Sequence, residues 1–374
     1  MHKSLRESSL SNRAYSKKKR RKNSRFVMVS SSFKRVTCIS SGVISLFLSF
    51  ITVICNGGLL YMLYKDPLRC LRKPVTVFIA SLAIVDFLTG LISDVSFAVH
   101  EFECVMGAGN PPGAIGNFSG ISYFFTVNSA LLLVAALSIE RLIAVVFPHF
   151  YRRSVTSKRI VMLVAGIYIF SLLFALLQLA RIPEEIYHNM DLNIHITFPL
   201  STVTIMYTVI YINLRKRRKV AALQIAAPAV LNLRRASAIQ STSDARREAR
   251  NMRIEQKLVS TAFIIVLCMV VALVPYLVFV YMEMECPSCI DTEWFFACRR
   301  LCVPFLFINS SVNPIIYAWR LEHYRKSFKA MLVSADDSLA FESRDDILNT
   351  RPVIQVEDAC NQTYNQSLTL TTST

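Results

Sequence analysis

Asn313, Pro314 and Tyr317 stand near the end of the last long apolar stretch of this chain, in the order Asn-Pro-Ile-Ile-Tyr. Proline removes a backbone donor and clashes with the preceding turn, so a helix must kink where Pro314 stands. The freed carbonyls and the Asn313 amide need polar partners or water, and lipid offers neither. The sequence therefore predicts a kinked membrane helix whose polar part faces a cavity.

Glu140 and Arg141 form a charged pair at the end of another long apolar stretch. An acid beside an arginine at the edge of a membrane lies at a low-dielectric boundary, where electrostatic interactions are strong. Two states follow: the arginine is paired with its acids, or it is released to an incoming partner. We therefore predict that this pair acts as a switch and has no catalytic role.

Asp86 places a carboxylate in the middle of the second apolar stretch. A lone charge buried in lipid costs several kcal/mol, so this group must be protonated or must have polar partners. The residues by themselves indicate a packing network in which every polar group is satisfied. The candidate partners on facing helices are Asn56, Ser129, Asn309, Ser310 and Asn313.

Long uncharged runs are the elements that would position these side chains. The chain is 53% hydrophobic and only 18% charged, and its charges are crowded between the neutral runs. Runs of this length span a bilayer as helices, so the lipid bilayer is an expected partner. No room remains for a sizeable water-soluble catalytic domain, and we expect no enzyme. We predict an all-α bundle of seven transmembrane helices, at 36–64, 74–99, 114–146, 160–180, 192–214, 258–282 and 301–319.

A basic amphipathic segment follows the last span. Leu321, Tyr324, Phe328 and Leu332 recur at helical spacing among Lys and Arg. This pattern is typical of a helix that lies on the membrane surface. We predict a short eighth helix at 320–331.

Lys and Arg are concentrated in the connections between the first and second, third and fourth, and fifth and sixth spans. The positive-inside rule therefore predicts a cytoplasmic tail and an extracellular N-terminus, and it explains most of the net charge of +17 without a nucleic-acid partner. A basic N-terminal segment at 1–36, which we expect to be disordered, conflicts with this topology; a nuclear or nucleic-acid role is the alternative, and a true start at Met28 resolves the conflict. The helical domain covers 37–331, and a disordered cytoplasmic tail covers 332–374.

Five of the ten cysteines lie in or near the predicted outer connections, where disulfides persist. Cys286 and Cys289 are separated by only two residues, in Cys-Pro-Ser-Cys. Such a pair forms a short disulfide or contributes to a metal site, but a metal site requires further paired ligands nearby. We predict a disulfide, and no metal.

The motifs above, together with Pro199 and Tyr207 in the fifth run and Pro275 in the sixth, resemble those of rhodopsin-like (class A) G protein-coupled receptors over about 37–331. The resemblance implies that Arg141 bridges Glu140 and Glu255 to hold the third and sixth helices together in the off state. A single solvated charge at Glu255 is the alternative. It also implies that Tyr207 approaches the tyrosine of the Asn-Pro-x-x-Tyr motif in the active state.

In this family the aspartate of the second helix holds an allosteric sodium ion, so the resemblance implies a sodium site at Asp86. The position where the family commonly places a ligating serine is Ala130 here, with Ser129 next to it. The tryptophan expected two residues before Pro275 is Leu273. These departures put sodium binding in question and indicate a different ligand trigger.

The second predicted outer connection contains no cysteine, and Gly116 stands where the family places the cysteine of the third helix. These features resemble the melanocortin, adenosine, cannabinoid and lysophospholipid receptor cluster. From the geometry of the predicted spans we expect a mostly apolar pocket with few polar groups, which suits a peptide, a lipid or a small molecule. Its expected lining residues are Asp94, Tyr123, Thr126, Val127, Phe279 and Phe307.

The resemblance thus implies a plasma-membrane receptor that transmits an extracellular ligand signal to heterotrimeric G proteins. Ser237, in a basic context, is a candidate phosphorylation site, and phosphate on the Ser/Thr-rich tail would give an arrestin an acidic surface to bind. The alternative is a membrane interaction or scavenger protein that has the same fold and does not signal.

Overall fold

The computed structural model describes residues 31–66, 74–106, 114–180, 182–226, 235–290, 292–322 and 324–329. Within this part of the chain, seven helical spans are long and apolar enough to cross a membrane. They coincide with the seven predicted apolar runs, so the all-α membrane bundle is confirmed.

Several spans are made of more than one helical element. The spans are, in order, α2 (Ser31–Lys65); α3 (Pro74–Leu88) with the π-helix η1 (Thr89–Asp94) and α4 (Val95–Val105); α5 (Ala114–Val146); α7 (Ser157–Leu176) with the 3₁₀-helix η2 (Leu177–Ala180); α8 (Glu184–Asp191) with the π-helix η3 (Leu192–Thr197) and α9 (Phe198–Ala226); α10 (Arg235–Glu285); and α12 (Glu293–Arg320). Two short helices, α6 (Pro148–Ser154) and α11 (Pro287–Ile290), lie in connections between spans.

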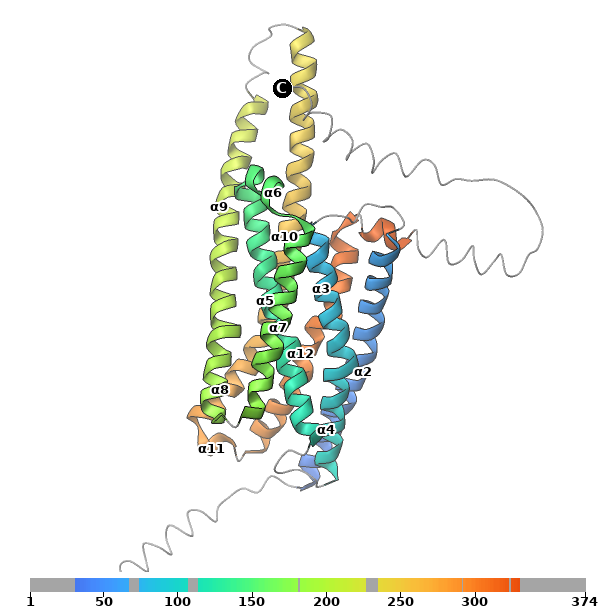
Figure 1. Ribbon diagram of the computed structural model, residues 1–374, viewed down its shortest axis with the longest axis vertical. Coiled ribbons are helices and arrows are strands. Elements are labelled where there is room, and N and C mark those ends of the chain that lie inside the picture. Colours follow the sequence, from blue (N-terminus) through green and yellow to red (C-terminus); the bar gives the residue numbers. More distant parts are fainter. Residues whose placement is uncertain are drawn as a thin grey trace, which may run out of the picture.

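The spans form one elongated bundle in which α5 occupies a central position (Figure 1). α5 packs against α3, α4, α7, α9 and α10, whereas α2 packs against α4 and α12. α9 and α10 extend beyond the other helices at the upper end of the view (Figure 1). The central helix therefore positions any residue that must face several other spans at once.

The first helix begins at Ser31, so residues 31–36 of the segment that was predicted to be disordered are helical. This prediction was wrong at its boundary. One reason is a contact across the bundle: the Lys34 ammonium lies 5.8 Å from the centre of the Phe296 ring. A cation over an aromatic face stabilises the polar extension of a helix beyond its apolar run.

Beyond α12, residues 324–329 are helical, inside the predicted eighth helix. Leu321 and Tyr324 are buried, whereas Lys326 is exposed, as expected for an amphipathic helix. Burial raises the pKa of Tyr324 to about 12. The tail after 331, the N-terminal segment before Ser31 and the side chain of Ser237 lie outside the described residues.

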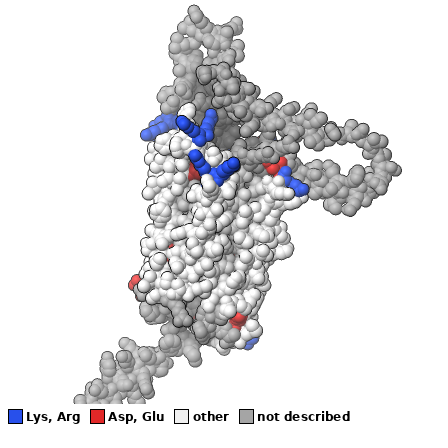
Figure 2. Space-filling model, viewed as in Figure 1, with Lys and Arg blue, Asp and Glu red and all other residues white. Residues whose placement is uncertain are grey.

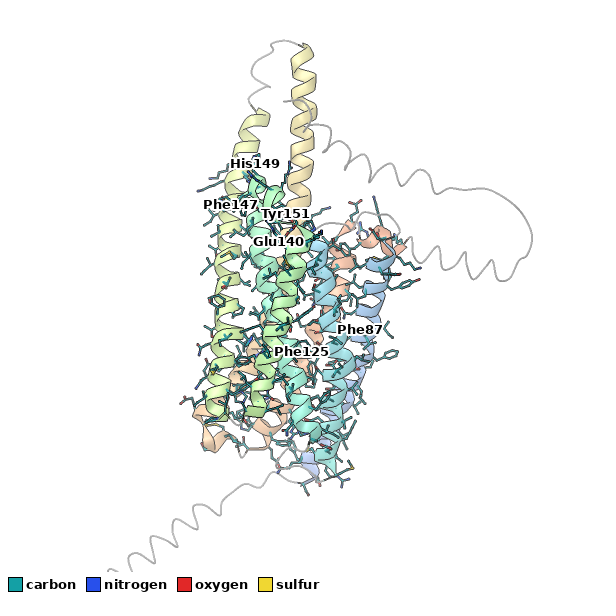
Figure 3. The ribbon with its side chains drawn as sticks, in the orientation of Figure 1. Phe87, Phe125, Glu140, Phe147, His149 and Tyr151 are labelled. Atoms are coloured by element: carbon teal, nitrogen blue, oxygen red, sulfur yellow. A yellow bond between two sulfur atoms is a disulfide. The ribbon has the colours of Figure 1, made fainter. Side chains whose placement is uncertain are left out.

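Lys and Arg gather at the upper end of the described surface (Figure 2). This end carries α6, with Arg152 and Arg153, and the start of α7, with Lys158 and Arg159. The bundle therefore has one basic end, and the predicted switch residue Glu140 lies at the same end, beside Tyr151 (Figure 3).

A disulfide at the opposite end joins Cys38 of α2 to Cys104 of α4. Two polar contacts accompany it: the Arg300 guanidinium of α12 binds the Glu101 carboxylate at 2.7 Å, and the Ser41 hydroxyl donates to the Arg300 carbonyl at 3.3 Å. Three spans are thus fastened together at this end. The sequence did not predict this disulfide, because Cys38 belongs to an apolar run.

We expect Cys38→Ser to lower the melting temperature of the purified protein by several degrees. A disulfide that closes a loop of this length stabilises a protein by about 2–4 kcal/mol. Intrinsic tryptophan fluorescence during heating measures the change. Cys55→Ser is the matched control, because Cys55 is a free cysteine on the same helix. Equal melting temperatures for the two variants, or labelling of Cys104 by a thiol reagent in the wild type, would contradict the bond.

Candidate functional site

Arg141 is buried near the end of α5 that lies at the basic end of the bundle, and it is held by its neighbour. We call this basic end the inner end and the opposite end the outer end. Its Nε and Nη2 atoms donate to the two carboxylate oxygens of Glu140, and the Tyr151 hydroxyl of α6 donates to the same carboxylate. Burial and the nearby Glu140 carboxylate raise the pKa of Tyr151, so its phenol keeps the proton that it donates. The arginine is therefore in the paired state of the predicted switch.

A small cavity lies directly beside the arginine at this end of the bundle. Arg141 and Tyr317 both line it, so the structure brings these two predicted residues to one place. The remaining lining is apolar apart from a single threonine, and it comes from α3, α5, α10 and the residue after α12: Val75, Ile79, Leu137, Leu258, Thr261, Ala262, Ile265 and Leu321. α10 thus closes the space that a partner would need in order to reach Arg141.

The predictions for Tyr207 and Glu255 have different outcomes. Tyr207 is buried against Phe263, with ring centres 5.4 Å apart, and does not line the cavity beside Arg141. The side chain of Glu255 lies outside the described residues, so its bridge to Arg141 stays a prediction.

A contact that the sequence did not predict fastens α10 to α12 at the same end. The Arg320 Nη2 atom donates to the Ser260 hydroxyl at 2.6 Å. Arg320 is the last residue of α12, and Ser260 lies on α10 beside the residues that line the inner cavity. The only signal in the sequence was an arginine three residues after the Asn-Pro-x-x-Tyr motif, and its partner could not be identified from spacing.

Asp86 lies at the centre of the bundle and is fully buried. The Asn313 Nδ2 atom donates to Asp86 Oδ2 at 2.8 Å, so the predicted pair of α3 and α12 exists. Asn56 instead donates to the backbone carbonyls of Thr52 and Ser310, each at 3.0 Å. Among the described residues, five side-chain oxygens of the predicted network have no hydrogen-bond partner: Asn56 Oδ1, Asp86 Oδ1, Ser129 Oγ, Asn309 Oδ1 and Asn313 Oδ1.

A second and larger cavity lies between this polar centre and the outer end of the bundle. Thr126, Val127 and Phe307 of the predicted pocket line it, together with Asn309 and Ser310 from the polar centre. Its apolar lining consists of Ala130, Leu131, Met269, Ala272, Leu273 and Leu306. The structure therefore joins the predicted pocket to the polar centre through one cavity.

The other predicted pocket residues lie apart from this cavity. Phe279 packs against Trp294 and Phe295, with ring centres 6.2 and 5.7 Å away, and does not line this cavity, so its place in the ligand pocket stays a prediction. Tyr123 stands beside the cavity, with its ring centre 6.2 Å from that of Phe307. Asp94 is fully buried and does not line the cavity.

Tyr276 and Arg299 were missed by the sequence analysis. The Arg299 guanidinium lies 5.0 Å from the centre of the Tyr276 ring, and its Nε donates to Glu283 at 3.1 Å. The Tyr276 ring in turn lies 5.9 Å from that of Tyr123. These contacts connect Arg299 through Tyr276 and Tyr123 to Phe307, which lines the cavity.

Cys286 and Cys289 are joined in a disulfide in the connection between α10 and α12. Among the described residues there is no group of three or more His, Cys, Asp or Glu side chains that could hold a metal ion. The geometry therefore favours the disulfide over the metal-site alternative for this motif.

Comparisons with known proteins agree with this arrangement. The family model described as "7 transmembrane receptor (rhodopsin family)" matches residues 55–317. Cannabinoid receptor 2 of Mus musculus is 24% identical over 310 residues, which cover 79% of this chain and 81% of that receptor. The D(1A) dopamine receptor of Didelphis virginiana is 25% identical over 310 residues, covering 71% of this chain and 67% of that one.

A solved structure shares the fold. The crystal structure of squid rhodopsin superposes with a TM-score of 0.67 over 90% of this chain and 92% of that chain, at 16% identity. At this identity the likeness concerns the arrangement of the helices alone.

Proposed function

Because the chain belongs to the rhodopsin family of seven-transmembrane receptors and is a G protein-coupled receptor, we propose that an extracellular ligand bound near the outer cavity opens the inner cavity to a heterotrimeric G protein. The observation that carries this proposal is the position of Arg141. It is buried and paired with Glu140, and it lines a cavity whose far wall is α10. An outward swing of α10 would enlarge this cavity and expose the arginine to a partner.

In this proposal the closed state is the arrangement in which α10 residues line the cavity beside Arg141, and this feature of the structure supports it. A ligand shifts the equilibrium only by its difference in affinity for the two states. A change from 1:99 to 99:1 requires about 5.5 kcal/mol of such preference. Tyr207 and Tyr317 would approach each other in the open state, as the resemblance implies.

For the ligand, the outer cavity favours a compound that is mostly apolar with a few polar groups. Thr126, Asn309 and Ser310 are the polar groups of its lining, and Val127 and Phe307 are among its apolar ones. Small-molecule sites are typically lined by apolar side chains with a few polar groups that fix the orientation of the ligand. A lipid or small molecule would have to widen this space on binding, and a peptide would have to widen it more.

For the sodium site, the donor set near Asp86 fits a small hard cation. Carboxylate, hydroxyl and amide oxygens are the ligands that such cations prefer. Asp86 Oδ1, Ser129 Oγ and Asn313 Oδ1 are buried and have no hydrogen-bond partner among the described residues. These three residues would hold the ion, which would supply positive charge beside Asp86 when the receptor is closed.

The basic end of the bundle supports a cytoplasmic location for that end, under the positive-inside rule. The N-terminus would then be extracellular and the tail cytoplasmic, in a multi-pass protein of the plasma membrane. Phosphorylation of Ser237 or of the tail would add the negative charge that an arrestin binds.

The test is guanine-nucleotide exchange on purified heterotrimeric G proteins by the receptor in lipid nanodiscs, with one G protein class at a time. We expect one class to respond to the receptor in the absence of added ligand, and to respond more when helix contacts at the inner end are weakened. A receptor that stays silent with every class, even after such weakening, would favour the non-signalling alternative.

One such contact is the tether between α10 and α12. We expect Ser260→Ala to raise basal exchange about threefold to tenfold, because a hydrogen bond to a charged group contributes about 1.5–3 kcal/mol at most and water replaces part of it. Thr204→Val is the matched control, since the exposed Thr204 hydroxyl donates to the Leu200 carbonyl of its own helix α9 and lies outside the inner cavity. An equal response from the two variants would show that the tether does not restrain α10.

A further inference from the structure

Three acidic side chains lie on one face of the second span: Asp86, Asp94 and Glu101. Asp86 and Asp94 are eight residues apart across the π-helical η1, and Glu101 follows after seven residues, so about two turns separate each pair. All three are buried, at 0%, 0% and 1% exposure. This face of the span therefore carries a row of carboxylates through the bundle.

Two of the three acids have a partner from α12. Asn313 donates to Asp86 at 2.8 Å, and Arg300 binds Glu101 at 2.7 Å. Asp94 differs, since neither of its carboxylate oxygens has a hydrogen-bond partner in the part of the chain that the structure describes. The middle acid of the row is the one without a protein partner.

The register between α2 and the second span identifies what faces Asp94. The Ser49 hydroxyl donates to the Gly90 carbonyl at 2.7 Å. Gly42 lies beside Ala98 and Phe102, and Cys38 is bonded to Cys104. The two helices are antiparallel, so residue numbers of facing pairs add to a nearly constant value.

The same register places Ser45 level with Asp94. Ser45 lies between Gly42 and Ser49 at helical spacing, so it shares the face that α2 turns toward the second span. Its hydroxyl is fully buried and also has no hydrogen-bond partner among the described residues. Two buried polar groups without protein partners, one from each helix, thus occur at one level.

The third neighbour, α12, brings no donor to this level. Ser41 donates to the Arg300 carbonyl and Thr52 hydrogen-bonds to Ser311, so the residue of α12 level with Ser45 is Pro304. Proline has no backbone N–H, and its position in the helix leaves the carbonyl four residues earlier without its usual donor. The nearest cation from α12, Arg300, is already paired with Glu101.

A buried carboxylate without a donor either keeps a proton or meets a cation. We propose that Asp94 and Ser45 form a site for a small monovalent cation, Na⁺, between α2, the second span and α12. A single carboxylate balances one positive charge, and oxygen ligands suit a hard ion. This site is separate from the centre at Asp86, and the proposal does not depend on coupling to a G protein.

The test measures stabilisation by Na⁺ in a variant that lacks the Asp86 carboxylate. Purified Asp86→Asn receptor is heated in NaCl and, at equal ionic strength, in choline chloride, whose cation is too large for an enclosed site. Binding to the folded state alone raises the melting temperature by mass action. We expect Na⁺ to raise it by about 2 °C or more, and we expect this rise to disappear in Asp86→Asn/Asp94→Asn.

Two outcomes would overturn the proposal: no response to Na⁺ in Asp86→Asn, or a response that persists in the double variant. The second outcome places the ion elsewhere, and the first leaves Asp94 as a protonated carboxyl.

If the double variant does not fold, Ser45→Ala in the Asp86→Asn background tests the proposed site instead. We expect this substitution to raise severalfold the Na⁺ concentration that is needed for a given rise in melting temperature. Ser171→Ala is the matched control, because Ser171 is equally buried and has no described partner, but lies on α7. An equal effect of the two serine variants would also overturn the site.

Discussion

Replacement of Arg141 by alanine is expected to reduce guanine-nucleotide exchange to below about a tenth of the wild-type rate, because the open inner cavity loses the buried cation that a partner would meet. A hydrogen bond to a charged group is worth about 1.5–3 kcal/mol, which corresponds to a change of roughly tenfold to a hundredfold. Removal of the arginine also frees Glu140 and weakens the closed state, but an open cavity without its cation gains no partner. The loss of the partner contact therefore outweighs the loosening.

The measurement uses the Ser260→Ala receptor as background, so that basal exchange is high enough for a decrease to be seen. Surface level is matched by an epitope tag. Arg159→Ala is the control, because Arg159 is an exposed arginine at the start of α7 whose guanidinium donates to the Ser154 carbonyl. Full exchange by the Arg141→Ala receptor would refute the mechanism.

Glu140→Gln is expected to have the opposite effect and to raise basal exchange about fivefold to tenfold. Glutamine keeps the shape of the side chain but removes the charge that accepts both the Arg141 and the Tyr151 hydrogen bonds. Charge-assisted hydrogen bonds are roughly twice as strong as neutral ones. The closed state alone contains this pair, so its loss acts on one side of the equilibrium, and a tenfold shift corresponds to about 1.4 kcal/mol.

Tyr151→Phe separates the two bonds. It removes the phenol donor and leaves the pair of Glu140 with Arg141, so we expect a rise of only about twofold from the loss of one hydrogen bond. A Glu140→Gln receptor with wild-type basal exchange at equal surface level would show that Arg141 is not restrained by its neighbour. A Tyr151→Phe effect as large as that of Glu140→Gln would assign the restraint to α6.

The transmembrane spans could be predicted closely because a bilayer imposes a minimum apolar length on each helix, and uncharged runs such as 114–146 are visible without any knowledge of packing. The pair of Asp86 with Asn313 was also predictable, since a carboxylate in lipid requires a polar partner and few were available. Constraints that act on single segments are therefore readable from the sequence.

Contacts between helices were less predictable, because they depend on the rotation of each helix. Phe279 packs against Trp294 and Phe295, and the sequence did not indicate these contacts. The π-helical turns at Thr89–Asp94 and Leu192–Thr197 were not predicted, and each changes the direction of every residue that follows it. Ser260 and Arg320 meet for the same reason: 60 positions separate them, and only the bundle brings them together.

The fastening of α2, α4 and α12 by the Cys38–Cys104 disulfide and the Glu101–Arg300 ion pair has a mechanical consequence. These three spans form a stiff frame, because the two contacts prevent them from separating at their outer ends. A ligand that expands the outer cavity must then displace the spans outside this frame, among them α10. Ligand binding would therefore move α10, the helix that covers Arg141, more than it moves α2.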